Sequence, residues 1–576
     1  TALDTHCARC VMWSCSERAL KALTDGRILH EGETPEDMLG RIVGMFASME
    51  VSLGGDPGLA RDLADHLYRK RFVPSTPILM NAGRPVQRPL SACCVPPVSL
   101  KSPLHQIKAV IDQYHEDGMG TGFDLNEVDD PVSMVLYLND VAVEGLARGN
   151  QRRPVGNMGV LRVSHSRIRE FVRLKRDRGD VDWKFNLSVD VSDEFMRLVR
   201  EGGQLQLDDG TRVSAAGLFA EIVEAAHACG DPGLVFLDRM NARNPLSRKS
   251  RYVSTAPCGE MGLARGEACQ FLSLNLREFA APGGIDIECL RRAVPLAVRF
   301  LDDALEQSIR TYASHESRQA MLYGRRIGLG VCGFSDLLLR AEVEYGSARS
   351  RELLAEALSV VNAESKRASM ELAEERGSFG GFAESGYYVD GDFLQRKFGA
   401  LDTRFVRSRH WRELDLELRR RGMRNASTVV LPPTGRCSLV FDTSQQIEPL
   451  FSLCDSSGRP HPELVKHLIE RYSPTEALAA LDVARRDGSL REAAGVSPET
   501  RGLFATAIEI PHETHLALLR VAQHYSDDAV SKTVNLPAAA TAADVLEIYS
   551  AAHESWLCGI TVYRDGCSPK QPLRLH

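Results

Sequence analysis

The sequence predicts an α/β protein. From Phe72 onward, short apolar runs bounded by Gly, Pro and Asn alternate with longer helical patterns, such as 287–305 and 351–375, and this alternation is typical of α/β folds. The chain has 576 residues, of which 43% are hydrophobic and 26% charged. It can therefore bury a large core, and it exceeds the size at which a single core usually divides.

The first part of the chain predicts helices. Ser16 stands before Glu-Arg-Ala-Leu, and Thr34 stands before Pro-Glu-Asp-Met-Leu. In each case a hydroxyl that can cap a helix precedes acidic and then spaced apolar residues, which is the usual signature of a helix start. We expect a helical region over residues 1–70 and the α/β part over 71–576.

Composition limits the partners and the compartment. The net charge of −7 and the pI near 6.2 provide no basic surface for a nucleic-acid backbone, so no nucleic-acid partner is expected. The fourteen cysteines lack the spacing of a disulfide framework, which favours a reducing cytosol and a cytoplasmic protein. No run of eighteen apolar residues and no opening signal segment occurs, so neither a membrane partner nor secretion is expected.

The most informative stretch surrounds Cys258, which lies between Pro257 and Gly259. Proline fixes one backbone angle and glycine permits an unusual one, so this thiol is expected on a rigid loop. Glu260 could act on the same substrate as general base, and Cys269 could supply reducing equivalents as half of a disulfide pair. That interpretation needs a second cysteine, which the stretch 90–98 offers as Cys93 or Cys94.

Two stretches suit an anionic phosphate. One has two hydroxyls between prolines, and the other has turn amides, two hydroxyls and a guanidinium around one glycine. As isolated strings, both are more often ordinary turns. Their residues are Ser75 and Thr76, and Pro433, Thr434, Gly435, Arg436, Cys437 and Ser438.

Several other features favour structural interpretations, and no metal site is predicted. Cys7 and Cys10 could bind zinc or exchange disulfides, but a single pair beside one histidine is weak. We interpret Gly328–Gly333 as close helix packing rather than a phosphate loop. We also expect structural thiols at Cys558 and Cys567, and hydrogen-bonded rather than metal-binding rings at His512, His515 and His524.

The sequence resembles the adenosylcobalamin-dependent, or class II, ribonucleotide reductases from about Ser16 to Leu573. Each matching stretch is weak alone, but their order makes the resemblance specific. The stretches are 71–83 (RFVPSTPILMNAG), 91–93 (SAC), 120–123 (GTGF), 157–159 (NMG), 257–260 (PCGE), 432–435 (PPTG), 447–449 (IEP), 531–533 (SKT) and 559–566 (GITVYRDG).

The resemblance implies a ten-stranded barrel of two half-barrels with a central finger loop that carries Cys258, preceded by the small helical N-terminal region. It implies radical reduction of ribonucleotides to 2′-deoxyribonucleotides for DNA synthesis, with adenosylcobalamin as cofactor. The implied partners are the ribonucleotide substrate and an external thiol reductant, such as a thioredoxin-like protein; a homodimer is compatible with it. The sequence lacks adjacent tyrosines after the Pro433 stretch and a glycyl-radical motif, which also favours adenosylcobalamin.

The resemblance also implies roles for individual residues. Cys258 would form the thiyl radical, Glu260 would accept a proton from the 3′-hydroxyl, and Cys93 with Cys269 would donate two electrons and become a disulfide. Cys94 is the alternative donor. The implied substrate-binding residues are the two phosphate stretches together with Ala92, Gly122 and Ala256, and the implied specificity loop contains Gln151, Arg152 and Arg153.

The sequence departs from the family at three points. Ala256 replaces an Asn expected to hold the 2′-hydroxyl, the loop after Val128 is short, and the chain ends at His576 without a cysteine-rich tail. Ala256 motivates a second hypothesis, a radical nucleotide-modifying enzyme that performs ribose epimerisation or dehydration in a specialised nucleoside pathway. A non-enzymatic nucleotide-binding homologue is a third hypothesis, which the joint presence of the cysteines and Glu260 disfavours.

Overall fold

The computed structural model describes residues 13–149, 153 and 155–567. Three helices form the N-terminal region: α1 (Glu17–Asp25), α2 (Pro35–Leu53) and α3 (Ala60–Tyr68). The two predicted caps are confirmed, because the Ser16 hydroxyl accepts the amide of Ala19 at 3.0 Å and Thr34 forms a capping box with Asp37. These local signals fix where α1 and α2 begin.

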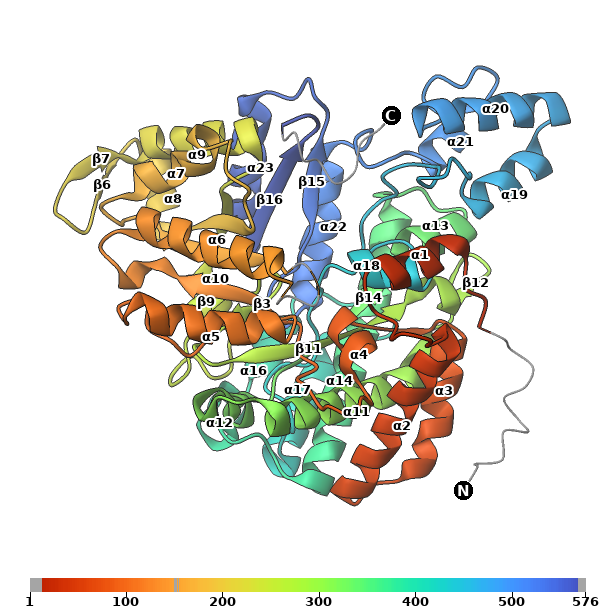
Figure 1. Cartoon of the computed structure of the whole chain (residues 1–576). Coiled ribbons are helices and arrows are strands. Elements are labelled where there is room, and N and C mark those ends of the chain that lie inside the picture. Colours follow the sequence, from red (N-terminus) through yellow and green to blue (C-terminus); the bar gives the residue numbers. More distant parts are fainter. Residues whose placement is uncertain (1–12, 150–152, 154, 568–576) are drawn as a thin grey trace.

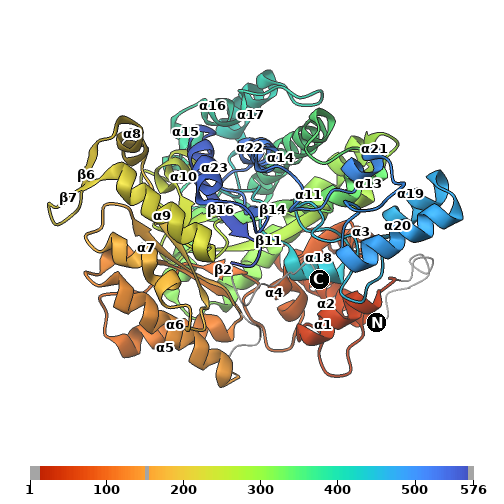
Figure 2. The same cartoon turned by 90° about the horizontal axis from the view of Figure 1, so that it is seen from above.

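The first half of the central sheet is parallel. Its strands are β2 (Cys93–Cys94), β3 (Gly120–Asp124), β4 (Asn157–Arg162), β5 (Phe185–Asp190) and β8 (Gly233–Val235), which pair in that order. The helices that connect and flank them are α5 (Leu104–Glu116), α6 (Pro131–Ala147), α7 (Ile168–Asp177), α8 (Asp193–Glu201), α9 (Ala215–Cys229) and α10 (Leu237–Arg243). Figure 2 shows α5, α6, α7 and α9 together on one side of the strands.

The second half runs through β11 (Ala268–Asn275), β14 (Ile327–Cys332), the stretch 429–431, the segment of Val530 and β15 (Thr533–Leu536), and β16 (Gly559–Arg564). Parallel pairs join β11 to β14 and β15 to β16, and parallel bridges join Leu329 to Val429 and Leu431 to Val530. The two halves meet in antiparallel pairs, β2 with β11 and β8 with β16. The ten strands therefore close into a ring, which confirms the predicted barrel.

Long helices cover the second half, namely α11 (Ile287–Thr311), α12 (His315–Gly324), α13 (Phe334–Arg340), α14 (Ala348–Arg376), α22 (His512–Tyr525) and α23 (Ala542–Glu554). The predicted helical patterns at 287–305 and 351–375 lie within α11 and α14. No helix in the described part of the chain combines the length and apolar character needed to cross a bilayer.

Shorter elements complete the fold. The helices are α4 (Thr76–Asn81), α15 (Gly386–Val389), α16 (Phe393–Phe398), α17 (Ser408–Arg421), α18 (Gly435–Val440), α19 (Pro462–Arg471), α20 (Pro474–Asp487) and α21 (Pro498–Leu503), and the strands are β1 (Phe72–Pro74), β6 (Gln204–Gln206), β7 (Arg212–Ser214), β9 (Ser254–Thr255), β10 (Gly262–Leu263), β12 (Ala280–Ala281) and β13 (Gly284–Ile285). Helices α19–α21 form a separate lobe in Figure 1 with a small core of their own.

The prediction for Gly328–Gly333 was wrong in one respect. This stretch forms β14 rather than a helix contact. Its glycines bring strands close to bulky neighbours: a Cβ at Gly328 would lie 2.4 Å from the Phe271 ring, and one at Gly330 would lie 2.8 Å from Pro432. These glycines therefore leave room for the side chains of neighbouring strands in the barrel, rather than for a helix outside it.

A buried ionic cluster joins the N-terminal region to the barrel. Glu50 of α2 is fully buried and pairs with Arg299 of α11 at 2.8 Å and with Arg376 of α14. Arg376 also pairs with Asp303 of α11 at 2.7 Å. Figure 1 shows α2 beside α11 and α14. Each of these charges is compensated by a neighbour, so the interface depends on all of them.

Candidate active site at the finger hairpin

A short hairpin, the finger hairpin (β9, β10 and the turn 256–261), lies against β3 and β4 inside the ring. The Ala256 amide donates to Met261 O at 2.9 Å, and the Gly259 amide donates to Ala256 O at 2.9 Å. Gly259 has φ +75°, a conformation that L side chains rarely adopt. The expected rigid turn around the thiol is thus present in the structure.

The sheet leaves room for the hairpin by using glycine. A Cβ at Gly122 of β3 would lie 2.2 Å from Thr255 O, and one at Gly120 would lie 2.8 Å from Pro257 Cγ and 3.5 Å from Cys93 Sγ. The Asn186 side chain of β5 donates to Pro257 O at 2.8 Å. Sequence reasoning missed Asn186, because it is one of three polar residues that alternate with apolar ones in β5.

The Cys258 side chain is exposed, whereas Ala256 and Glu260 on either side are buried. Desolvation nevertheless raises the pKa of Cys258 well above the ordinary thiol value, and the Glu260 charge adds to the effect, while Arg153 opposes it. An accessible sulfur with a desolvated environment lies in a recess of the protein rather than on its outer surface. Because its pKa is raised, the Cys258 sulfur keeps its hydrogen as a thiol. A protonated thiol is a poor nucleophile, so this site is unsuited to chemistry that needs a thiolate.

Glu260 is 2% exposed, and its Oε2 atom has no hydrogen-bond partner among the described residues. Burial raises the pKa of Glu260 to about 7, although the backbone amides of Glu260 and Cys258 oppose the shift. A carboxyl group that titrates near neutral pH can take up and return a proton under ordinary conditions. Its free oxygen leaves an acceptor position open for a ligand.

Cys93 and Cys269 are direct partners across the antiparallel pair of β2 and β11. Cys93 is half-buried and Cys269 is fully buried, and desolvation raises the pKa of both thiols. Cys94 belongs to the main core cluster, whereas Cys93 and Cys269 share a separate cluster with Ala256 of the hairpin. The structure thus brings Cys93, not Cys94, to the same side as Cys269.

The two predicted phosphate stretches meet at the start of α4 and α18. Thr76 Oγ1 and Cys437 Sγ are 3.2 Å apart. In the described part of the protein the buried Ser75 hydroxyl has no hydrogen-bond partner, and half-buried Arg436 forms no ion pair or hydrogen bond. A free hydroxyl and a free guanidinium next to the same junction suit an anionic group.

Other residues predicted for substrate binding have internal partners. The Thr434 hydroxyl accepts the amide of Gln446 at 2.9 Å, and the Ser438 hydroxyl donates to Gly435 O at 3.0 Å. Pro433 is exposed and Gly435 begins α18. Ala92 donates its amide to Cys269 O at 3.1 Å and so holds β2 on β11. The Thr434 and Ser438 hydroxyls are therefore occupied by internal hydrogen bonds, and Ala92 contributes to the site through its backbone.

The predicted specificity loop is represented by Arg153. Its Nε donates to Gly118 O at 2.7 Å, and its Nη2 contacts Ala92 O at 3.4 Å. Burial lowers the pKa of Arg153, while the nearby Cys93 sulfur opposes the shift. The guanidinium therefore lies beside the thiol recess. Gln151 and Arg152, like Cys7 and Cys10, lie outside the described residues.

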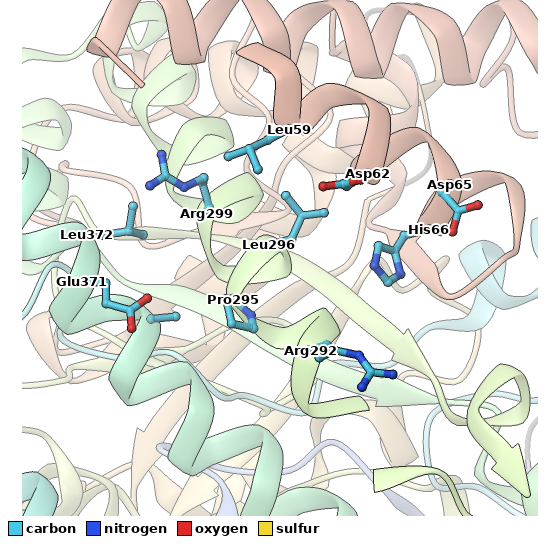
Figure 3. Close-up of a pocket in the computed structure, with 11 residues that line it drawn as sticks. Leu59, Asp62, Asp65, His66, Arg292, Pro295, Leu296, Arg299, Glu371 and Leu372 are labelled. Carbon is cyan, nitrogen blue, oxygen red and sulfur yellow. The ribbon is translucent and has the colours of Figure 1, made fainter. Parts of the chain in front are cut away.

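Remaining candidates do not join this site. A cavity of about 390 Å³ lies between α3, α11 and α14, with acidic and basic side chains around it (Figure 3), but it contains none of the predicted residues. His515 and His524 contact the carbonyls of Ala507 and Phe398 at 3.0 Å, as expected. His512 Nε2 instead has no hydrogen-bond partner in the described chain and lies 3.7 and 3.6 Å from the carboxylates of Glu513 and Glu547.

Comparison with known proteins finds relatives over most of the chain. The family model described as "Ribonucleotide reductase, barrel domain" matches residues 125–563, and the model described as "Ribonucleotide reductase, all-alpha domain" matches residues 15–87. The Vitamin B12-dependent ribonucleoside-diphosphate reductase of Mycobacterium tuberculosis (strain CDC 1551 / Oshkosh) is 34% identical over 96% of this chain and 80% of its own length. The protein of the same name from Thermoplasma acidophilum is 32% identical over 87% of this chain and 64% of its own.

A solved structure shares the fold. The Actinobacillus ureae class Id ribonucleotide reductase alpha subunit aligns with a TM-score of 0.75 over 96% of this chain and 97% of that chain. The two sequences are 19% identical. This similarity carries the architecture alone, and the chemistry must be argued from the residues of this chain.

Proposed function

The chain belongs to the ribonucleotide reductase family, and we propose that it reduces the ribose 2′-hydroxyl of ribonucleoside diphosphates in a reaction initiated by adenosylcobalamin. Its M. tuberculosis and T. acidophilum relatives carry that cofactor class and that substrate in their names. The product would be the 2′-deoxyribonucleotide used for DNA synthesis. The alternative of ribose epimerisation or dehydration has no support among these relatives.

The observation that carries the proposal is the convergence of four side chains around one recess. The finger hairpin supplies Cys258 and Glu260, and the strand pair β2 and β11 supplies Cys93 and Cys269. A protonated thiol, a carboxyl group near neutral pKa and a dithiol are the three groups that radical deoxygenation of a sugar requires.

In the proposed reaction, Cys258 as a thiyl radical takes the 3′ hydrogen atom of the ribose. Glu260 accepts the proton of the 3′-hydroxyl, which helps the 2′-hydroxyl to leave as water. Cys93 and Cys269 become a disulfide: of the two protons and two electrons that they supply, one proton leaves with the 2′-hydroxyl as water, and the other proton and both electrons reduce the sugar. Glu260 returns its proton to the 3′-oxygen, and Cys258 returns the hydrogen atom to the 3′ carbon. Each chain group thus ends in its starting state except the dithiol.

The residues present fit the cofactor at one point that the structure describes. The Cys258 side chain is exposed while the turn around it is buried and hydrogen-bonded, so the sulfur is accessible to a group placed over the hairpin. When bound, adenosylcobalamin supplies the one-electron chemistry that converts the Cys258 thiol to a radical. The role of the chain is to hold that sulfur still and to keep it protonated.

Substrate phosphates would be met by Ser75, Thr76 and Arg436, whose polar groups border the recess. The exposed part of the dithiol is Cys93, which is the sulfur that an external reductant, such as a thioredoxin-like protein, would attack. Since the cycle requires free thiols, we propose a reducing cytoplasmic compartment.

Anaerobic incubation with each ribonucleoside diphosphate, adenosylcobalamin and dithiothreitol tests the proposal. We expect the matching deoxyribonucleoside diphosphate by chromatography and mass spectrometry, with no product when the cofactor is omitted. Parallel incubation with triphosphates compares the two substrate classes. A product with an epimerised or dehydrated sugar, or no consumption of any nucleotide, would contradict the proposed reaction.

A further inference from the structure

Asp528 is a buried acid that the proposed reaction does not use. It is 1% exposed, and among the described residues only the Tyr252 hydroxyl interacts with its carboxyl group, without the geometry of a full hydrogen bond to either oxygen. A buried carboxyl group with two unpaired oxygens is rare in folded proteins, because the desolvation cost is then not repaid. We therefore expect a function that requires a carboxyl group at this position.

The backbone places Asp528 beside the active site. The amide of the next residue, Ala529, donates to Glu260 O at 3.1 Å, and Gln523 Nε2 donates to Asp528 O at 2.5 Å. The segment that carries Asp528 is therefore anchored to the finger hairpin. The charged and titratable groups around its carboxyl are Tyr252, Cys269, Arg326, Lys397, Asp527 and Cys558.

The neighbouring charges are committed elsewhere. Arg326 donates to Glu267 at 3.0 Å, to the Tyr252 hydroxyl at 2.7 Å and to Asn244 Oδ1 at 2.8 Å. Burial raises the pKa of Asp528, and the Arg326 and Lys397 charges offset this only in part. Asp528 therefore holds a proton more readily than an ordinary aspartate.

The adjacent Asp527 has the opposite character. It pairs with Lys366 at 2.5 Å and accepts the amides of Thr428 and Val429 at 2.8 and 2.9 Å. Burial alone would raise the pKa of Asp527, but the Lys366 charge, with the other nearby positive charge and the hydrogen bonds to Asp527, more than offsets this effect. The pKa of Asp527 is therefore held below the ordinary value. Of these two successive aspartates, Asp527 is an anion fixed by three strong partners, whereas Asp528 has only the Tyr252 hydroxyl beside its carboxyl group.

Reduction of the Cys93–Cys269 disulfide requires a proton donor near Cys269, and Asp528 could supply that proton. When the Cys93–Cys269 disulfide is reduced again, an external thiolate attacks the half-buried Cys93, because Cys269 is fully buried. Cys269 must then leave as a thiolate inside the protein, where burial raises its pKa and the charges of Cys93, Glu260 and Asp528 raise it further. Without a nearby proton donor this departure is strongly disfavoured.

We propose that Asp528 is the proton carrier for Cys269: its carboxyl group protonates the departing thiolate during re-reduction and takes the proton back when the disulfide forms. The inference rests on the proposed dithiol role of Cys93 and Cys269. It assigns the two buried acids near the hairpin to different steps, Glu260 to the sugar and Asp528 to the dithiol.

The step balances in atoms and electrons. The first thiol of an external dithiol loses its proton to solvent and attacks Cys93, the Cys93–Cys269 bond breaks, and Cys269 leaves with the electron pair and takes the Asp528 proton. The second external thiol then attacks its own partner sulfur and releases Cys93 as a thiolate. Of the two protons that the external dithiol loses, one returns to Cys93 and one to Asp528, and the external dithiol ends as a disulfide.

The test needs neither nucleotide nor cofactor. The full chain is oxidised with diamide, which is then removed, and the Cys93–Cys269 disulfide is identified by alkylation and peptide mass spectrometry. Its re-reduction by dithiothreitol is then followed by acid quench across pH for the wild type, D528N and D528E. D415N is the matched control, because Asp415 is also buried but lies at α17 and accepts the amides of Leu394 and Gln395.

We expect D528N to slow re-reduction near neutral pH by about tenfold or more, D528E to recover part of the rate, and D415N to match the wild type. The wild-type pH profile should contain a decrease that follows ionisation of one carboxyl group and is absent from D528N. Circular dichroism shows whether D528N folds. If it does not, the test uses the pH dependence of the re-reduction rate in the wild type and D528E. A wild-type rate that depends on pH only through the ionisation of dithiothreitol overturns the inference.

The outcomes separate the inference from the proposed function. If Cys93 and Cys269 form no disulfide, the dithiol assignment fails and takes the inference with it. If the disulfide forms and D528N exchanges as fast as the wild type, Asp528 carries no proton and the proposed function is untouched. Loss of nucleotide reduction in an otherwise normal exchange assay would count only against the proposed function.

Discussion

Cys93 on β2 and Cys269 on β11 face each other as direct partners of an antiparallel pair. Residues opposite each other in such a pair have Cα atoms roughly 4.5–5.5 Å apart, which lies within the range that a disulfide requires. The pair can therefore oxidise and be reduced with little backbone movement. Both residues are free thiols in the structure.

The first prediction concerns this pair. Cys269→Ser should stop multiple turnover, because no disulfide can form, whereas Cys94→Ser should retain turnover, because Cys94 lies in the main core cluster. Product formed per enzyme over time, with dithiothreitol as reductant, measures the difference. A Cys94→Ser enzyme as inactive as Cys269→Ser would reassign the second thiol.

Cys258→Ser should abolish nucleotide consumption, since a serine hydroxyl holds its hydrogen too strongly to serve in the radical step. Cys93→Ser should instead permit at most one abortive event that releases the base. Cys289→Ser, which alters a half-buried thiol of α11, is the matched control and should be active. Released base and deoxynucleotide are measured by chromatography, and deoxynucleotide from Cys258→Ser would contradict the assignment.

The Glu260 carboxyl predicts a pH dependence. As the pH falls through about 7, the value to which burial raises its pKa, the proton-accepting form is lost, so turnover should decrease tenfold per pH unit below that point. Glu260→Gln should lower turnover by roughly 10²–10⁴-fold and remove this limb. The profile should be recorded on the chemical step in single-turnover experiments.

The raised pKa of Glu260 also predicts that the stability of the fold decreases as the pH rises, whereas turnover increases. The folded protein binds the Glu260 proton more tightly than the unfolded chain, whose carboxyl keeps its ordinary pKa near 4.5. The free energy of unfolding should therefore fall as pH rises from about 4.5 to about 7, by about 3 kcal/mol in total. Glu260→Gln should lack this contribution, and a difference from wild type that does not vary with pH would contradict it.

Gly122→Ala should reduce activity by displacing the finger hairpin. The new Cβ would meet Thr255 O at 2.2 Å, and a backbone oxygen cannot move without moving Cys258. Gly156→Ala is the matched control, because its Cβ would meet Pro257 Cβ at 3.4 Å, an ordinary contact. Turnover and the thermal midpoint should both be measured, and equal activities would show that the hairpin tolerates the shift.

The ionic cluster predicts a large stability effect at one residue. Glu50→Gln removes a fully buried charge that pairs with Arg299 and Arg376, so it should lower the free energy of unfolding by about 3 kcal/mol. Glu375→Gln removes a more exposed partner of Arg299, with 33% of its side chain accessible, and should cost less than about 1 kcal/mol. Denaturant unfolding of both variants measures the contrast.

Features that depend on neighbouring residues in sequence could be predicted. The caps at Ser16 and Thr34, the long helices α11 and α14 and the rigid turn at Cys258 follow from local chemistry. The barrel and the pairing of Cys93 with Cys269 came from the family resemblance, because no spacing along the chain reveals which strands are neighbours.

Other features depend on contacts between distant segments. The glycines of β14 looked like helix-packing residues because the Phe271 ring that they accommodate lies in another strand. Asn186 and Asp528 gave no usable signal for the same reason: Asn186 matters through its bond to Pro257 O, and Asp528 through its burial with too few partners for its two oxygens. Only the folded arrangement distinguishes Asp528 from Asp527.

Closure of the ring has a consequence for how the protein is made. Strand β8 pairs with β16, and a bridge joins Leu431 to Val530. On a ribosome the enclosure around Cys258 therefore cannot be complete until residues as far as β16 have emerged. A prematurely terminated chain would contain the reactive cysteines without the closed barrel around them. Radical chemistry at Cys258 therefore becomes possible only after the strands that close the barrel have been synthesised.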